Sequence, residues 1–186
     1  MGPAQRELCP NWQQERAADW PSANPLPWFA IVSKPQHERT VLDGLVQKNL
    51  EGFLPSYWAT RRWSDRMKRV QAPLFPQYVF CRFDPDRRLP VLQTPGVRSI
   101  ISFGTRPTSI PEGEIERIRA IVASGSPLEP WPFLKAGQRV RVDDGPLAGL
   151  EGILAEGGNI RRVVVSLELL QRSVAVQFDR AHISPM

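Results

Sequence analysis

The chain has 186 residues, 41% of them hydrophobic and 23% charged, which is enough for one large or two small domains with a hydrophobic core. Its two cysteines, Cys9 and Cys81, cannot form a disulfide framework, and no cluster of cysteine and histidine has the spacing of metal ligands. No apolar run approaches the roughly 20 residues of a membrane span, and residues 1–27 lack the apolar centre of a signal peptide. We therefore expect a cytoplasmic protein without a metal, a cofactor or a membrane anchor.

The net charge of +5 is concentrated in one part of the chain. Residues 28–124 carry 15 Lys/Arg against 9 Asp/Glu, whereas residues 125–186 carry 7 of each. A basic part and a neutral part are expected to meet different partners.

The amino-terminal segment is predicted to be a disordered tail. Residues 1–27 combine five prolines with polar residues and two isolated tryptophans, Trp12 and Trp20. A strand is expected at 28–33, after Pro27, because the residues there form a compact apolar run.

A helix and a second strand follow. Residues 38–50 have the spacing of an amphipathic helix, and Asn49 and Gly52 supply the stop. A strand is predicted at 53–60, where Pro55 indicates an edge or a bulge. The apolar stripe of the helix is predicted to consist of Val41, Leu42, Leu45 and Val46.

Residues 61–69 contain five basic side chains and a tryptophan, and Ser64-Asp65 fits a hairpin tip. Basic side chains neutralise phosphate and an aromatic ring can stack on a base, so this hairpin is a candidate nucleic-acid site. The alternative is a solvated hairpin whose charges only protect a sheet edge. The candidate binding residues are Arg61, Arg62, Trp63, Arg66, Lys68 and Arg69.

The segment at 77–83 is predicted to be a strand with two apolar faces, because aromatic and aliphatic residues alternate along it. Pro73 and Pro76 fix its approach, since each removes a backbone donor. Such a strand lies in the middle of a sheet, or it packs one face on a core and offers the other to a partner.

The remainder of the first domain is predicted to hold a helical turn at 87–92, a tight turn at 94–97, a strand at 97–103 and a helix at 111–123. Two amphipathic helices and about five strands indicate an α+β fold with the helices on the sheet. The stripe of the second helix is predicted to be Ile115, Ile118, Ile121 and Val122.

Residues 124–133 are predicted to be a linker, because glycine and serine give way to prolines. Residues 134–186 are predicted to form a small all-β barrel, in which Gly145, Gly149 and Gly152 allow positive φ angles or close backbone approach. Its strands are expected at 138–142, 153–155, 162–169 and 173–178.

Two sets of motifs resemble a known family. The residues from Val140 to Gly152 resemble a KOW motif, the signature of an SH3-like barrel in ribosomal and transcription-elongation proteins. The first domain carries the landmarks of the NusG amino-terminal domain in the same order. Residues 28–184 therefore resemble the NusG/RfaH/Spt5 family over their whole length. The landmarks are Trp28-Phe29-Ala30-Ile31-Val32, Pro73-Leu74-Phe75-Pro76, Tyr78-Val79-Phe80, Thr94-Pro95-Gly96-Val97 and a helix led by Pro111.

The resemblance implies a transcription elongation factor, not an enzyme, that binds the clamp helices of RNA polymerase and suppresses pausing or termination. In the family the polymerase-binding surface is apolar. Aromatic side chains suit such a surface because they bury much area with few rotatable bonds. The matching residues are Trp28, Phe75, Tyr78 and Phe80.

The barrel resembles one that recruits a second partner, either the termination factor Rho or a small-subunit ribosomal protein, through an apolar tip at the positions of Leu147 and Leu150. The long tail and residues 169–176 resemble paralogues that act as antiterminators, so non-template DNA is a further implied partner. RfaH has a barrel that refolds as a helical hairpin, but the valines at 163–165 favour strands here. We expect a monomer with a β barrel.

A ribosome-associated or RNA-binding KOW protein is the main alternative, and it predicts salt-sensitive binding through the barrel and the 61–69 hairpin. The neutral charge of the barrel is unfavourable to it. An enzyme is disfavoured because no nucleophile motif is present and His37 and His182 fall in different domains.

Overall fold

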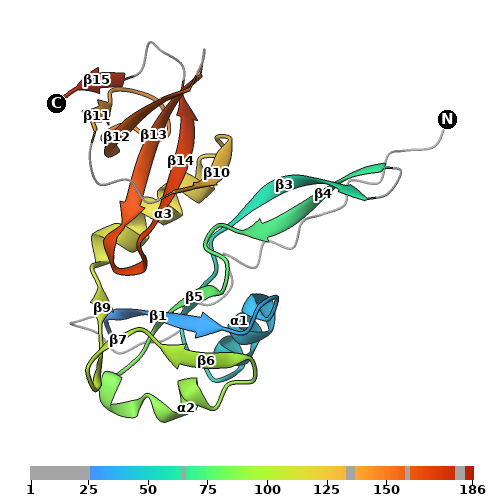
Figure 1. Cartoon of the computed structure of the whole chain (residues 1–186). Helices are drawn as coiled ribbons and strands as arrows, with labels where there is room; N and C mark the ends of the chain where they lie inside the picture. Colours follow the sequence, from blue (N-terminus) through green and yellow to red (C-terminus); the bar gives the residue numbers. More distant parts are fainter. Residues whose placement is uncertain (1–25, 64–65, 133–136, 158–159, 179–182) are drawn as a thin grey trace.

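The computed structural model describes residues 26–63, 66–132, 137–157, 160–178 and 183–186 (Figure 1). Residues 1–25 of the predicted disordered tail, which include Trp12 and Trp20, lie outside the described residues. His182 lies outside them as well.

An antiparallel sheet forms the centre of the amino-terminal half, in the order β2-β5-β1-β6 with β9 also paired to β1. The predicted central strand is β5, which lies between β1 and β2 as its two apolar faces require. The strands are β1 (Trp28–Ser33), β2 (Gly52–Phe53), β5 (Tyr78–Arg82), β6 (Val97–Ile100) and β9 (Ser109–Ile110).

Helices α1 (Glu38–Gln47) and α3 (Glu112–Ala123) pack with opposite faces of this sheet. Alternate residues of β1 point to opposite sides, so Phe29 joins the cluster that contains α1 and Trp28 joins the cluster that contains α3. We call residues 28–123 the N-terminal body. Its antiparallel sheet with a helix on each face confirms the predicted α+β class.

One residue of the predicted stripe of α1 is not buried. Val41, Leu42 and Leu45 lie in the core, but Val46 is 56% exposed. At 100° per residue, Val46 falls about 40° beyond Leu42 and off the edge of the stripe. The helix ends at Gln47, and Asn49 takes a positive φ of 57° just after it, as the predicted stop requires.

Strands β3 (Ser56–Trp63) and β4 (Arg66–Pro73) form a long two-stranded ribbon. Their register runs from Ser56 opposite Pro73 to Trp63 opposite Arg66, which confirms the predicted hairpin. The single strand predicted at 53–60 is wrong, because Pro55 lacks an amide donor and separates β2 from β3. The ribbon projects away from the sheet (Figure 1).

The connection from β5 to α3 contains a short 3₁₀ turn, η1 (Pro85–Arg87), and a single-turn helix, α2 (Leu89–Leu92). Gly96 has a φ of +91°, as the predicted tight turn requires. The strand predicted at 97–103 is interrupted after Ile100, and its end pairs elsewhere. It contributes β7 (Ser102–Phe103) to a small ribbon with β8 (Arg106–Pro107).

The carboxyl-terminal part is one six-stranded antiparallel sheet in the order β10-β14-β13-β12-β11-β15, which we call the C-terminal β unit. Its all-β structure agrees with the predicted KOW barrel. Leu128–Trp131, which the sequence places in a linker, form an added edge strand on β14. The strands are β10 (Leu128–Trp131), β11 (Arg139–Val142), β12 (Glu151–Gly157), β13 (Ile160–Leu167), β14 (Arg172–Phe178) and β15 (Ile183–Pro185), with a 3₁₀ turn, η2 (Glu168–Leu170).

The predicted glycine positions are explained by turns and by one close approach. Gly145 and Gly149 have φ angles of +85° and +84° in the turn after β11. A side chain at Gly152 would place its Cβ 2.5 Å from Val163 Cγ1 and 2.7 Å from the carbonyl oxygen of Val164. The adjacent strand therefore requires a glycine at position 152.

Candidate functional site

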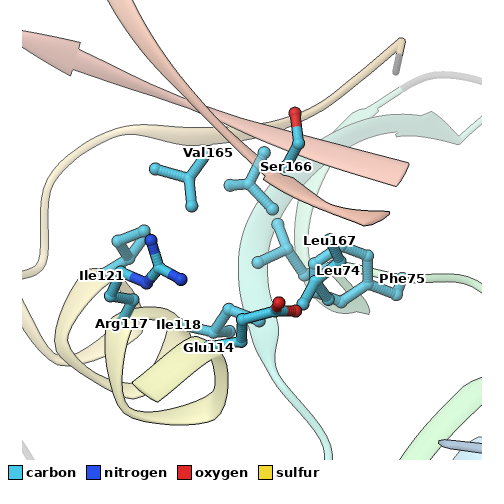
Figure 2. Close-up of a pocket in the computed structure, with 10 residues that line it drawn as sticks. Leu74, Phe75, Glu114, Arg117, Ile118, Ile121, Val165, Ser166 and Leu167 are labelled. Carbon is cyan, nitrogen blue, oxygen red and sulfur yellow. The ribbon is translucent and has the colours of Figure 1, made fainter. Parts of the chain in front are cut away.

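The N-terminal body and the C-terminal β unit meet at a buried apolar junction (Figure 2). The body contributes α3 and the segment between β4 and β5, and the C-terminal β unit contributes the end of β13 and the start of β14. We call this arrangement the docked form. The junction is lined by Leu74, Phe75, Glu114, Arg117, Ile118, Ile121, Val165, Ser166, Leu167 and Val174.

The predicted partner-binding segment is held at this junction by backbone hydrogen bonds. The amide of Leu74 donates to the carbonyl of Pro55 at 2.8 Å, and the amide of Tyr78 donates to the carbonyl of Phe75 at 3.1 Å. Gln77 takes a positive φ of 69°, which turns the chain from this segment into β5. Leu74 and Phe75 are thereby placed side by side against α3, and both are at most 2% exposed.

Phe80 and Tyr78 occupy the face of β5 that is turned toward α3. Both side chains pack with the apolar cluster that contains α3, which confirms the prediction that they share a face of the strand. They differ in how far they are exposed. Phe80 is fully buried, with its ring 5.9 Å from that of Phe75 in an edge-on contact and 6.2 Å from that of Phe53. Tyr78 is only partly buried. Of the four residues predicted to bind polymerase, Tyr78 is the one whose side chain keeps exposed surface in the docked form.

Trp28 forms the centre of a network that fastens α3 to the sheet. Its ring is fully buried, and the guanidinium groups of Arg82 and Arg119 each lie 4.9 Å from the ring centroid. Its indole Nε1 donates to Glu112 at 3.3 Å, and Glu51 binds both arginines. These contacts give Trp28 a packing function within the N-terminal body.

Glu114 brings a carboxylate into the junction. Burial raises the pKa of this carboxyl, Arg117 lowers it and Glu168 raises it again. Its Oε2 atom is buried and has no hydrogen-bond partner among the described residues. Glu168 belongs to η2 of the C-terminal β unit, so docking places two carboxylates near one another.

The predicted nucleic-acid residues lie on the β3–β4 ribbon. Arg62, Lys68 and Arg69 are exposed there, whereas the side chains of Arg61, Trp63 and Arg66 lie outside the described residues. Reasoning from sequence overlooked Trp58, which precedes the basic run and is 57% exposed.

Leu147 and Leu150, the predicted partner-binding residues of the C-terminal β unit, are 4% and 7% exposed and belong to its core. The amide of Leu150 donates to the carbonyl of Leu147 at 3.0 Å, so both residues lie in the closed turn after β11. In this arrangement they offer little surface to a partner.

No group of three or more histidine, cysteine, aspartate or glutamate side chains that could hold a metal is found in the part of the chain that the structure describes. Within the same residues, no helix is long and apolar enough to cross a membrane. Burial raises the pKa of the Cys81 thiol to about 12, which makes it a packing residue and not a nucleophile.

Comparison with known proteins places these features in a family. The sequence model of the family described as "Transcription termination factor nusG" matches residues 26–119, half of the chain. The transcription termination/antitermination protein NusG of Lactococcus lactis subsp. lactis (strain IL1403) is 28% identical over 167 residues, which cover 82% of this chain and 89% of the relative. The protein of the same name from Deinococcus radiodurans is 30% identical over 132 residues and covers 62% of this chain and 70% of the relative.

A further relative and a solved structure agree. The NusG protein of Pseudomonas aeruginosa is 27% identical over 148 residues, 76% of this chain and 83% of the relative. A solved structure described as "Domain interaction in Thermotoga maritima NusG" has a TM-score of 0.55 and 20% identity, and the match covers 84% of this chain and 95% of that one. This structural likeness supports the fold.

Proposed function

This chain belongs to the NusG family, and we propose that it is a transcription factor that binds RNA polymerase through the apolar segment around Phe75 and Tyr78. The observation that carries the proposal is the apolar Leu74-Phe75 segment, which adjoins β5 and which the C-terminal β unit covers. Apolar surface that needs a cover in the free protein is suited to a partner that replaces the cover.

Binding of polymerase is proposed to compete with docking. Phe75 is 2% exposed in the docked form, and it lines the junction with Leu167 and Val174 of the C-terminal β unit. A polymerase helix pair would therefore have to displace the C-terminal β unit before it contacts Phe75. Trp28 and Phe80, which lie beneath α3, would support this surface without touching the partner.

The released C-terminal β unit is proposed to recruit a second protein, Rho or a small-subunit ribosomal protein, and the whole is proposed to act as an antiterminator that suppresses pausing. Support comes from the family and from the distribution of charge, which leaves residues 125–186 neutral. The turn with Leu147 and Leu150 must open for those side chains to take part.

The test compares three forms of the full chain for binding to bacterial core RNA polymerase. An insertion of about 20 Gly/Ser residues after Ser126 lowers the effective concentration of the C-terminal β unit roughly tenfold. The extended chain is expected to bind polymerase more tightly than the wild type. Tyr78→Ala in the extended chain is expected to weaken binding at least about tenfold, because a central aromatic anchor is lost.

Val46→Ala is the matched control, since Val46 is an exposed apolar residue outside this surface. Circular dichroism and thermal unfolding confirm that each variant is folded. An extended, folded chain that does not bind polymerase would refute the proposal.

A ribosomal KOW protein is the weaker alternative. The family match covers residues 26–119, which lie outside the C-terminal β unit. A protein that binds ribosomes through its KOW barrel gives no reason for this match. Salt-sensitive binding to ribosomes with no binding to polymerase would favour it.

A further inference from the structure

One face of the β3–β4 ribbon is exposed from the Trp58–Gln71 pair to the Arg62–Met67 pair. Cross-strand partners point to the same side of a two-stranded ribbon, and every second pair shares a face. The pairs Trp58 with Gln71, Thr60 with Arg69 and Arg62 with Met67 therefore form one face, and all six side chains are exposed. We call this set the outer face.

The opposite face is turned toward the protein at its base. Ala72 is buried, and Tyr57, Ala59 and Val70 are half-buried. The ribbon is thus oriented by its base, and this orientation leaves the outer face uncovered.

Large apolar side chains on the outer face call for an explanation. Trp58 is 57% exposed and Met67 is 66% exposed, although both could have been polar on a solvated ribbon. A two-stranded ribbon is at best marginally stable in water, so surplus apolar exposure brings it no benefit on its own. On the outer face these apolar groups share one row with basic side chains, and an aromatic ring among basic side chains is the composition of a surface for single-stranded nucleic acid.

The charges around Trp58 have one sign. The strands Ser56–Trp63 and Arg66–Pro73 contain no aspartate or glutamate. The guanidinium of Arg69 lies 5.5 Å from the centroid of the Trp58 ring, in a cation–π contact. This contact orients the indole next to a positive charge, and the exposed part of the ring is left for a planar partner.

We propose that the outer face binds single-stranded nucleic acid, with a base stacked on Trp58 and with phosphates neutralised by Arg62 and Arg69. A single strand presents free base faces for stacking, whereas a duplex hides them within its own stack. An acidic protein surface would pair with the arginines, but only a single strand repeats a planar base and a phosphate at every unit, which matches a ring beside positive charges.

The test measures fluorescence anisotropy of labelled oligonucleotides with the full chain and no polymerase. Oligo(dT) and oligo(U) of about 12 nucleotides separate DNA from RNA, and a duplex of the same length tests the need for free bases. Trp58→Ala is expected to weaken single-strand binding about tenfold, and Trp58→Phe is expected to retain most of it, because stacking on an aromatic ring contributes much of the affinity per base. Arg69→Gln is expected to reduce the slope of log K against log salt by about 0.7.

Arg139→Gln is the charge-matched control, because its side chain is 71% exposed on the C-terminal β unit and it should leave the slope unchanged. Equal affinity for duplex and single strand, an unchanged affinity of Trp58→Ala, or no binding at about 50 mM salt would each overturn the inference. Because polymerase is absent from the assay, failure here leaves the proposed function intact. Retention of polymerase binding by Trp58→Ala would show that the two surfaces are separate.

Discussion

At the residue scale, Glu114 makes the docked form sensitive to pH. Docking buries its carboxyl near Glu168, and the raised pKa means that the docked form binds a proton more readily than the open form. Docking is therefore strongest below the ordinary pKa of a glutamate and weakens as the pH rises through the raised value. Arg117, the other charged group at this carboxyl, opposes the shift but does not cancel it.

Glu114→Gln is expected to increase the docked fraction at pH 7 and to remove most of its dependence on pH, because a neutral amide avoids burial of the charge. Amide chemical shifts of α3 and β13, followed from about pH 4 to about pH 8, measure this fraction. Glu116→Gln is the control, since Glu116 is exposed on the same helix and pairs with Arg119. A docked fraction that is constant with pH in the wild type would contradict the prediction.

Trp28 illustrates how the same residue type can have opposite functions in one chain. Trp28→Ala is expected to lower the free energy of unfolding by about 3–5 kcal/mol, because it leaves a cavity beneath α3. Trp58→Ala on the exposed ribbon is expected to change it by less than about 0.5 kcal/mol. Urea unfolding of both variants measures the difference, and a loss for Trp28→Ala as small as the one expected for Trp58→Ala would show that Trp28 is not a packing residue.

At the element scale, β10 controls the length of the tether between the two halves. Only residues 124–127 separate the end of α3 from β10, so Ala123 and Leu128 can be at most roughly 18 Å apart. A tether this short keeps the C-terminal β unit close to α3 and favours docking. Strand β10 is an edge strand, where Pro130 is tolerated because it need not donate to a further neighbour.

Arg162 is expected to hold β10 on β14. It pairs with Glu129 at 2.5 Å, and its guanidinium lies 5.2 Å from the ring of Trp131. Arg162→Ala is expected to speed hydrogen exchange of the β10 amides several-fold, because β10 has one neighbouring strand and loses both side-chain contacts.

Arg139→Ala is the control for this experiment, because its ion pair with Glu151 is long, at 3.7 Å, and solvent-exposed. If exchange in β10 is the same in both variants, backbone pairing alone holds the strand. Where β10 is released, the longer tether should also lower the docked fraction.

At the scale of the whole molecule, one apolar cluster extends from the sheet of the N-terminal body through α3 into the C-terminal β unit. Because this core is continuous, the wild-type chain is expected to unfold in a single thermal transition. The chain with the extended linker is expected to unfold in two transitions, since docking no longer couples the halves. Differential scanning calorimetry distinguishes these cases, and two transitions in the wild type would show that the junction adds little stability.

Much of the architecture could be predicted from local patterns. An apolar spacing of 3.6 residues predicts α1 and α3, alternation of side chains predicts β5, and glycine predicts the positive φ angles at Gly96 and Gly145. These features depend on neighbours in sequence. The two wrong local predictions also have local causes: Pro55 interrupts the strand predicted at 53–60, and Val46 lies off the apolar stripe of α1.

The sequence by itself determined the elements, the turns and the family, because periodicity, backbone stereochemistry and motif order are properties of the chain. Only the tertiary structure decided which apolar faces are free. The C-terminal β unit covers Phe75, and α3 covers Trp28 and Phe80. Residues of the predicted linker pair with β14 as strand β10. Each of these contacts joins segments far apart in sequence, and an apolar stripe looks the same whether a partner or the rest of its own chain buries it.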